Sequence, residues 1–314
     1  MFVSIVICTY NRVAILKNNF EYLKQLTIPE GVVWEVVVVD NNSQDSTKQY
    51  VESITSGFKV PVIYRFEENQ GIAYARNSGV RASNGDLIAF IDDDVFVTSN
   101  WLKEIVNAFK TYDPDLVGGK ILILDQESKP EWFSDRLVSL ASFDLGDKDI
   151  IADQDYQGLI GTIGNMCFKK KVFKRFGLFR EDLGRKGKKL TTGEETEYYW
   201  RMRMGGAKCV YYPSAVVHHF VELRKMTKSY VKNWYYNLGA FNCVLDREYG
   251  RDKSKQLLGV PRWRYRNAAK NLLDSIKFAF NRNGPESFHR LVLVYSFWGY
   301  FIKRQKIRFQ GNAR

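Results

Sequence analysis

The chain has 314 residues, of which 45% are hydrophobic and 15% aromatic, and this allows one large globular domain or one domain with an extension. Its four cysteines, Cys8, Cys167, Cys209 and Cys243, contain no CxxC pair, which excludes a disulfide framework and a zinc site and indicates buried thiols in a reducing compartment. No segment reaches the ~18 apolar residues of a membrane span, and the first residues show no signal peptide, so we expect a cytoplasmic protein.

The net charge of +12 lies in the C-terminal part of the chain. Residues 251–314 hold 15 basic and 3 acidic residues, whereas residues 1–250 hold 32 of each. A neutral body with a basic tail indicates an anionic partner for the tail, such as a membrane surface or a nucleic acid. A solvated basic face is the alternative.

The first hundred residues alternate between strand patterns and helix patterns. Strand-like apolar runs occupy residues 2–8, 32–39, 60–66 and 87–95, and helical patterns occupy residues 14–26, 45–54 and 71–82. The strands are too apolar to be half exposed. The pattern therefore predicts a parallel sheet with helices on both faces.

Polar residues stand at the ends of three of these strand patterns: Thr9–Arg12 after the first, Asp40–Ser43 after the second, and Asp92–Asp94 at the end of the fourth. In parallel sheets ligands bind beyond the carboxyl ends of the strands, so we expect the three segments at one edge. Three adjacent carboxylates repel one another, and a divalent cation such as Mn²⁺ or Mg²⁺ would neutralise them. A solvated acidic turn is the alternative.

At this point a resemblance becomes clear. The blocks SIVICTYNR, VVVVDNNSQDST and ENQGIAYARNSGVRASNGDLIAFIDDD resemble the successive motifs of family 2 glycosyltransferases of the GT-A fold. Gly161–Asn165, Gly193–Glu195 and His218–His219 resemble the acceptor-side half of that family. The resemblance covers about residues 2–245. It implies an α/β fold with a doubly wound, mostly parallel sheet flanked by helices, to which this chain adds a C-terminal helical extension.

The resemblance also implies an activity. Enzymes of this family move a sugar, with inversion, from a nucleoside-diphosphate sugar to a hydroxyl group. For this chain we expect a UDP-sugar first, with GDP and dTDP as alternatives. The expected acceptor is a glycan or a lipid-linked molecule, in the synthesis of cell-surface polysaccharide or glycolipid. We expect no specific nucleic acid partner.

By the same resemblance, Asp94, together with Asp92, holds a divalent metal, Mn²⁺ or Mg²⁺, that stabilises the departing diphosphate. His219, with His218 as second choice, would complete the metal or phosphate site. In the preceding strand pattern the residues at 213, 215 and 217 alternate, which places His219 on their face.

The resemblance implies a nucleotide-sugar site formed by Thr9, Tyr10, Arg12, Asp40, Asn42, Arg76, Asp92 and Asp93. Thr9, Tyr10 and Arg12 would line the base pocket, and Asp40 would accept a hydrogen bond from the uracil or ribose. Arg76 would contact the pyrophosphate or base, with a solvated helical arginine as the alternative.

The acceptor-side half supplies the predicted general base. Glu195 stands where the family carries the second acid of its ED motif, although the usual residue there is Asp, which leaves Glu194 as a second candidate. Capping of a helix dipole is the structural alternative for this acidic pair. Asn165 and Gly164 match positions near the acceptor and the donor sugar.

We expect a catalytic domain over residues 1–220, with a nucleotide-sugar half at 1–98 and an acceptor half at 99–220, followed by a basic helical extension at 221–314. Within the extension, residues 286–306 contain a mostly apolar run of twelve residues, LVLVYSFWGYFI, between basic ones. This run suits peripheral contact with the inner face of the cell membrane; a packed core helix is the alternative. Three other functions are alternatives to a glycosyltransferase: a sugar-phosphate nucleotidyltransferase, a catalytically silent relative, and a protein that binds nucleic acid or another polyanion through the basic tail.

Overall fold

The computed structural model describes residues 1–124, 130–133, 137, 142–152, 156, 158–186, 193–250, 252 and 254–311. The chain divides into two compact units. Unit 1 comprises Met1–Leu124, Ala141–Lys188 and Glu194–Phe220, and unit 2 comprises Asp125–Leu140, Lys189–Gly193 and Val221–Arg314. Every predicted site residue belongs to unit 1, so that unit is described first.

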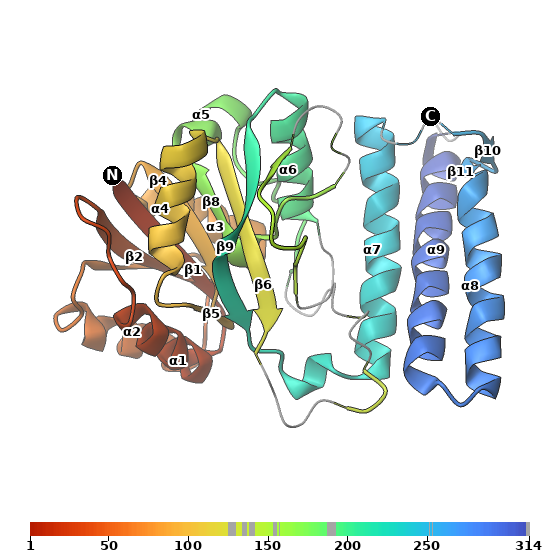
Figure 1. The fold of residues 1–314 in the computed structure, drawn as a ribbon, viewed down its shortest axis with the longest axis horizontal. Helices are drawn as coiled ribbons and strands as arrows, with labels where there is room; N and C mark the ends of the chain where they lie inside the picture. Colours follow the sequence, from red (N-terminus) through yellow and green to blue (C-terminus); the bar gives the residue numbers. More distant parts are fainter. Residues whose placement is uncertain are drawn as a thin grey trace. The chain divides into compact units, whose positions relative to one another are not determined.

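Unit 1 alternates strands and helices along the chain (Figure 1). Its strands are β1 (Phe2–Thr9), β2 (Val33–Asp40), β3 (Val62–Phe66), β4 (Leu87–Asp92), β5 (Val95–Val97), β6 (Leu116–Ile123), β7 (Ile150–Ala152), β8 (Met166–Lys169) and β9 (Cys209–His219). Its helices are α1 (Val13–Lys24), α2 (Thr47–Thr55), α3 (Ile72–Ala82), α4 (Trp101–Tyr112), α5 (Lys171–Phe176) and α6 (Glu194–Met204), with a short 3₁₀ helix η2 (Ile163–Asn165).

These strands form one sheet in the order β3-β2-β1-β4-β8-β6-β9-β5, and β7 pairs with β9. The pairs β3–β2, β2–β1, β1–β4 and β6–β9 are parallel, whereas β8 runs antiparallel to both β4 and β6. The sheet is therefore mostly parallel, as predicted, and its parallel strands end at one edge.

Helices cover both faces of this sheet because its strands are apolar on both. Val3, Ile5 and Ile7 of β1 share a buried cluster with residues of α1, α2 and α4. On the other face α3 lies so close that a Cβ added to Gly79 would be 2.4 Å from Cγ1 of Val6. These contacts confirm the prediction of a doubly wound sheet. The four cysteines are buried thiols, also as predicted.

One predicted strand differs from the structure. The pattern over residues 87–95 predicted a single strand, but β4 ends at Asp92, a turn follows at Asp93 and Asp94, and β5 begins at Val95. The side-chain amide of buried Asn19 donates to the carbonyl oxygens of Asp92 (3.2 Å), Asp93 (3.4 Å) and Val95 (2.8 Å). Asn19 thus satisfies the backbone groups that the turn removes from the sheet.

Unit 2 is mainly helical. It contains η3 (Leu223–Lys225), α7 (Lys228–Tyr249), a short hairpin of β10 (Gln256–Leu257) and β11 (Val260–Pro261), α8 (Arg262–Phe280) and α9 (Gly284–Gly311). Figure 1 shows α9 between α7 and α8, and it packs against both. These helices confirm the predicted helical character of the C-terminal extension.

Helices α7 and α9 cross at two glycines. A Cβ added to Gly239 of α7 would lie 1.8 Å from the carbonyl oxygen of Ser296, and one added to Gly299 of α9 would lie 1.8 Å from that of Tyr236. Only glycine permits this backbone contact. None of the helices in the described ranges combines the length and apolar character of a membrane span.

Candidate active site

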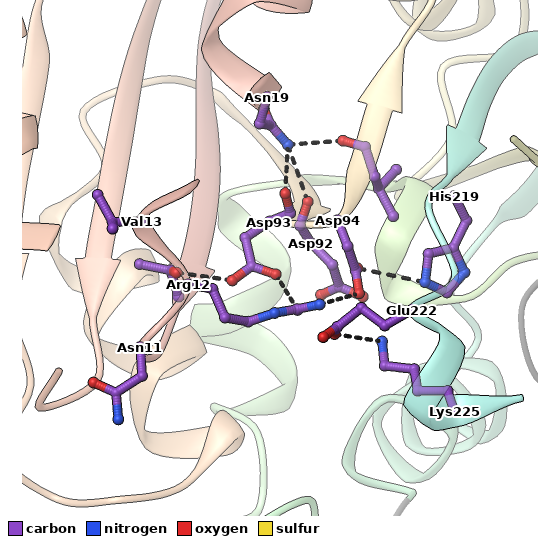
Figure 2. Close-up of polar contacts among 12 residues, drawn as sticks. Asn11, Arg12, Val13, Asn19, Asp92, Asp93, Asp94, His219, Glu222 and Lys225 are labelled. Carbon is purple, nitrogen blue, oxygen red and sulfur yellow. Dashed lines mark hydrogen bonds and ion pairs between the residues drawn. The ribbon is translucent and has the colours of Figure 1, made fainter. Parts of the chain in front are cut away.

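The predicted acidic motif forms the turn between β4 and β5. Figure 2 shows the three aspartates of this turn together with Arg12, which follows β1, and His219, the last residue of β9. Asp93 and Asp94 are buried, whereas the side chain of Asp92 is 39% exposed. The end of the sheet therefore brings together residues from three separate segments of the chain.

Arg12 neutralises two of these carboxylates. Its Nη1 lies 2.5 Å from Oδ1 of Asp93 and its Nη2 lies 2.9 Å from Oδ2 of Asp94 (Figure 2). The hydroxyl of Thr9 also donates to Asp93 (2.8 Å). Burial raises the pKa of Asp93 to about 7, against the attraction of Arg12 and with the repulsion of Asp94. Thr9 and Arg12, predicted to line a base pocket, thus contact the acidic turn, and Tyr10 is exposed.

His219 lies beside the same turn. Its Nε2 is 3.4 Å from Oδ1 of Asp94, and the residues of β9 alternate in burial as the sequence predicted. His218 points to the other face of the strand and pairs across the sheet with Phe96. Of the two histidines, His219 is the one that the structure places at the acidic turn.

A second cluster joins the two halves of unit 1. Arg76 of α3 is buried, so the alternative of a solvated helical arginine is wrong. Its Nη1 donates to Oε1 of Glu194, and its Nη2 lies 3.5 Å from Oδ1 of Asp92 and 3.9 Å from Oε2 of Glu195. One guanidinium therefore contacts the acidic turn and both candidate bases.

The two glutamates differ in their surroundings. Glu194 is buried and paired with Arg76, whereas the Glu195 side chain is 26% exposed. The backbone N–H of Ile163 donates to Oε2 of Glu195 (3.1 Å) and holds it in place. Burial and the neighbouring charge of Glu194 raise the pKa of Glu195 to about 7. A carboxyl group of this kind can accept a proton near neutral pH.

The end of β2 forms a separate part of the site. Asp40 is buried; its Oδ1 accepts from the backbone N–H of Ser43 (2.8 Å) and its Oδ2 from the hydroxyl of Tyr64 (2.9 Å). An open cavity of about 510 Å³ lies beside it, lined among others by Lys48 and Phe66. Asn42, in a left-handed conformation (φ 68°), donates to the carbonyl oxygen of Glu68 (3.2 Å).

Asn165 and Gly164 lie on η2. Asn165 is completely buried: its Oδ1 accepts from Nε1 of Trp101 (2.8 Å), and its Nδ2 donates to the carbonyl oxygens of Lys120 (3.0 Å) and Ala215 (2.7 Å). A direct sugar contact by Asn165 would require these bonds to break. A Cβ added to Gly164 would lie 3.5 Å from Oδ2 of Asp92, so Gly164 lies next to the acidic turn.

The acidic turn and its neighbours offer few donors for the expected metal. Within the described part of the chain, no group of three or more His, Cys, Asp or Glu side chains is arranged to hold a metal ion. Asp94 and His219 nevertheless offer an oxygen and a nitrogen donor side by side. Mg²⁺ is typically held by one or two carboxylates together with substrate phosphates and water. The pair therefore fits a metal that binds together with a diphosphate.

Comparison with known proteins decides the family. The model of the family described as Glycosyl transferase family 2 matches residues 4–177, which is more than half of the chain. The chain belongs to Glycosyl transferase family 2. It is a glycosyltransferase, and this membership removes the support for a nucleotidyltransferase and for a protein that acts by binding nucleic acid.

Two curated relatives cover most of this family 2 glycosyltransferase. The glucosyl-dolichyl phosphate glucuronosyltransferase of Haloferax volcanii is 29% identical over 226 residues, covering 70% of this chain and 69% of that protein. The succinoglycan biosynthesis protein ExoM of Rhizobium meliloti is 26% identical over 219 residues, covering 69% of this chain and 66% of its own.

Solved structures support the fold. The mannosyltransferase PcManGT from Pyrobaculum calidifontis, in complex with GDP-Man and Mn²⁺, superposes with a TM-score of 0.58 at 15% identity, over 99% of this chain and 75% of its own. TarS of S. aureus gives a TM-score of 0.57 at 16% identity, over 93% of this chain and 55% of its own. At these identities the likeness concerns the fold alone, and it confirms the predicted GT-A architecture.

Proposed function

We propose that this glycosyltransferase is metal-dependent and inverting, and that it moves a sugar from a nucleoside-diphosphate sugar to a hydroxyl of a glycan or lipid-linked acceptor. The observation that carries the proposal is the position of Arg76, which lies within 4 Å of Asp92 in the acidic turn and of Glu195. A leaving group held at the turn and a hydroxyl deprotonated by Glu195 would therefore meet in one place.

In the proposed reaction Glu195 takes the proton from the acceptor hydroxyl. The hydroxyl oxygen forms a bond to the anomeric carbon of the donor, and the bond from that carbon to the diphosphate breaks, with its electron pair leaving on the diphosphate. Glu195 is favoured over Glu194 because Glu194 is buried and held by Arg76, whereas Glu195 is partly exposed. Its raised pKa suits a base that works near neutral pH.

The divalent ion, Mn²⁺ or Mg²⁺, would stabilise the negative charge of the departing diphosphate. Asp94 and His219 would hold it, with Asp92 as a further donor at the exposed side of the turn. Arg12 would lie against the same carboxylates and limit their repulsion before the ion binds. Mn²⁺ in the complexes of PcManGT and of GalNAc-T7 supports a divalent ion here.

For the donor we propose a nucleotide sugar whose base lies near Asp40 and Tyr10, with UDP first and GDP or dTDP as alternatives. The complexes of TarS with UDP and UDP-GlcNAc, and of PcManGT with GDP-Man, support this class. The names of the two relatives point to glycan and lipid-linked acceptors in polysaccharide or glycolipid synthesis.

We assign catalysis to residues 1–220, with the donor bound by residues 1–98 and the acceptor by residues 99–220, and we assign a supporting role to residues 221–314. The cytoplasmic location and a position at the inner face of the cell membrane also stay proposals. In the predicted contact segment 286–306, α9 buries Val292 and Tyr300 within unit 2 and leaves Trp298 and Ile302 exposed.

A donor screen tests the proposal. The purified protein with Mn²⁺ is offered a panel of UDP-, GDP- and dTDP-sugars, with and without a membrane extract as acceptor source, and release of the nucleoside diphosphate is measured. One active donor, with activity lost on chelation of the metal, supports the proposal. Glu195→Gln serves as the inactive control. Silence of the wild type across the whole panel would identify a catalytically silent family member and overturn it.

A further inference from the structure

Helix α8 exposes a stripe of large apolar side chains. Leu273 is 67%, Ile276 48% and Phe280 84% exposed, and their spacing of three and four residues places them along one face of the helix. Leu272 beside them is also exposed. A contiguous apolar stripe on a surface helix typically marks an interaction site.

The same helix is strongly basic. Between residues 262 and 283 the sequence has six Lys or Arg and one acidic residue, Asp274. Asp274 lies 4.0 Å from Arg290 of α9, so its charge is offset within the bundle. Lys270 and Lys277, by contrast, are exposed next to the apolar stripe. The outer face of α8 therefore combines apolar side chains with positive charge.

The bundle explains why this face is on α8. Helix α9, whose apolar run was predicted to contact a membrane, packs between α7 and α8 (Figure 1). This packing buries part of its apolar side chains. Helix α8 packs against α9 through residues such as Ser275, whose hydroxyl donates to the carbonyl oxygen of Ser287 (2.9 Å). The opposite side of α8 carries the stripe.

We propose that α8 binds the surface of an anionic lipid bilayer, with Leu273, Ile276 and Phe280 entering the boundary of the acyl chains and Lys270 and Lys277 contacting the headgroups. Lipid satisfies both halves of this face, because an interfacial helix gains from apolar burial and from attraction to anionic lipids. A second copy of the chain would bring like charges together. A nucleic acid would contact the basic side chains of α8 but leave its aliphatic side chains exposed to water.

The proposed function includes a position at the cell membrane, and α8 is the element that would make this contact. The inference rests on that part of the proposed function and not on the proposed chemistry. It is tested without sugar transfer. The full chain is sedimented with vesicles of phosphatidylcholine alone and of phosphatidylcholine with phosphatidylglycerol, at low and high salt. We expect binding to the anionic vesicles that weakens as salt rises.

Two variants locate the contact. Ile276→Ser with Phe280→Ser should weaken vesicle binding at least tenfold, because two large apolar side chains no longer enter the lipid. Lys270→Glu with Lys277→Glu should remove most of the salt-sensitive binding. Met204→Ser, which changes an equally exposed apolar residue on α6 (67%), is the matched control and should bind as the wild type does.

Three results would overturn the inference: no vesicle binding by the wild type, unchanged binding by both α8 variants, or a dimer in light scattering that Phe280→Ser dissociates. Circular dichroism of each variant verifies that it is folded. A protein that binds vesicles through α8 but transfers no sugar would refute the proposed chemistry and leave this inference standing, so the two failures are distinguishable.

Discussion

The two acidic clusters of unit 1 both bring carboxylates close together beside one arginine, but the arginine is shared differently in each. At the β4–β5 turn, Arg12 divides itself between Asp93 and Asp94, and both carboxylates are buried. At the start of α6, Arg76 pairs closely with Glu194 and leaves Glu195 at 3.9 Å. In the proposed mechanism the first arrangement would keep two carboxylates together for a cation, and the second would leave one carboxylate able to accept a proton. The way in which an arginine is shared separates the two proposed roles.

The largest expected effect comes from the first cluster. Asp94→Ala should lower kcat/KM by on the order of 10³-fold, because a metal contributes several kcal/mol to the transition state. The measurement is nucleoside diphosphate release over a Mn²⁺ titration. His218→Ala, a change on β9 beside His219, is the control and should retain most of the activity. Equal losses in the two variants would contradict the assignment to Asp94.

The second cluster should lose chemistry without losing donor affinity. Glu195→Gln should lower kcat about 10²- to 10⁴-fold with little change in the KM for the donor, because a base contributes that much. Glu194→Gln should instead lower the thermal stability, because Arg76 loses its closest partner in a buried site. If Glu194→Gln abolishes turnover while Glu195→Gln stays active, the two roles are reversed.

The pH dependence of kcat gives a smaller effect that also separates the proposed roles of the two clusters. Since the base must be unprotonated and the pKa of Glu195 is raised to about 7, kcat at saturating donor should fall about tenfold per pH unit below 7 and level off above 8. The residual activity of Glu195→Gln should lack this limb. An unchanged limb in that variant would assign the titration to another group.

Stability should follow the opposite course. The native pKa values of Asp93 and Glu195 lie above those of the unfolded chain, so the native state binds more protons between about pH 4 and 7. Their contribution to stability is present below that range and is lost as pH rises through 7. The melting temperature of the metal-depleted protein should therefore fall between pH 5 and 8, and by less in Glu195→Gln.

The smallest expected effect concerns Asn19. Asn19→Leu should remove three hydrogen bonds to the turn and cost about 1–3 kcal/mol in the free energy of unfolding. It should also weaken Mn²⁺ binding, measured by calorimetry. This effect should exceed its effect on the stability of the protein without donor. Asn107→Leu on α4, whose amide contacts only partly buried Glu104, is the control. A stability loss with unchanged metal affinity would limit Asn19 to a structural role.

The sequence predicted the sheet well because valine-rich runs such as residues 36–39 are fully buried on both faces. It also placed His219 correctly, since alternation along β9 is a local property. It missed the return of the chain to a strand at Val95, because the turn at Asp93 and Asp94 depends on the side-chain amide of Asn19 in α1. Asn19 is the one polar residue among the buried positions of that helix, and this signal could have revealed it.

The pairing of charges could not be read from the chain. Arg12 was predicted at a nucleotide base, yet it contacts carboxylates more than eighty residues away. Arg76 and Glu194 are 118 residues apart. Such contacts depend on how helices pack on the sheet, and neither spacing nor composition encodes that distance.

The crossing of Gly239 and Gly299 has a consequence for how the basic extension can vary. A methyl group at either position would act as a wedge between two backbones and push α9 away from α7. Because α8 packs on α9, the wedge would also shift α8 and its apolar, positively charged face. Gly239 and Gly299 therefore govern the orientation of the exposed apolar stripe on α8.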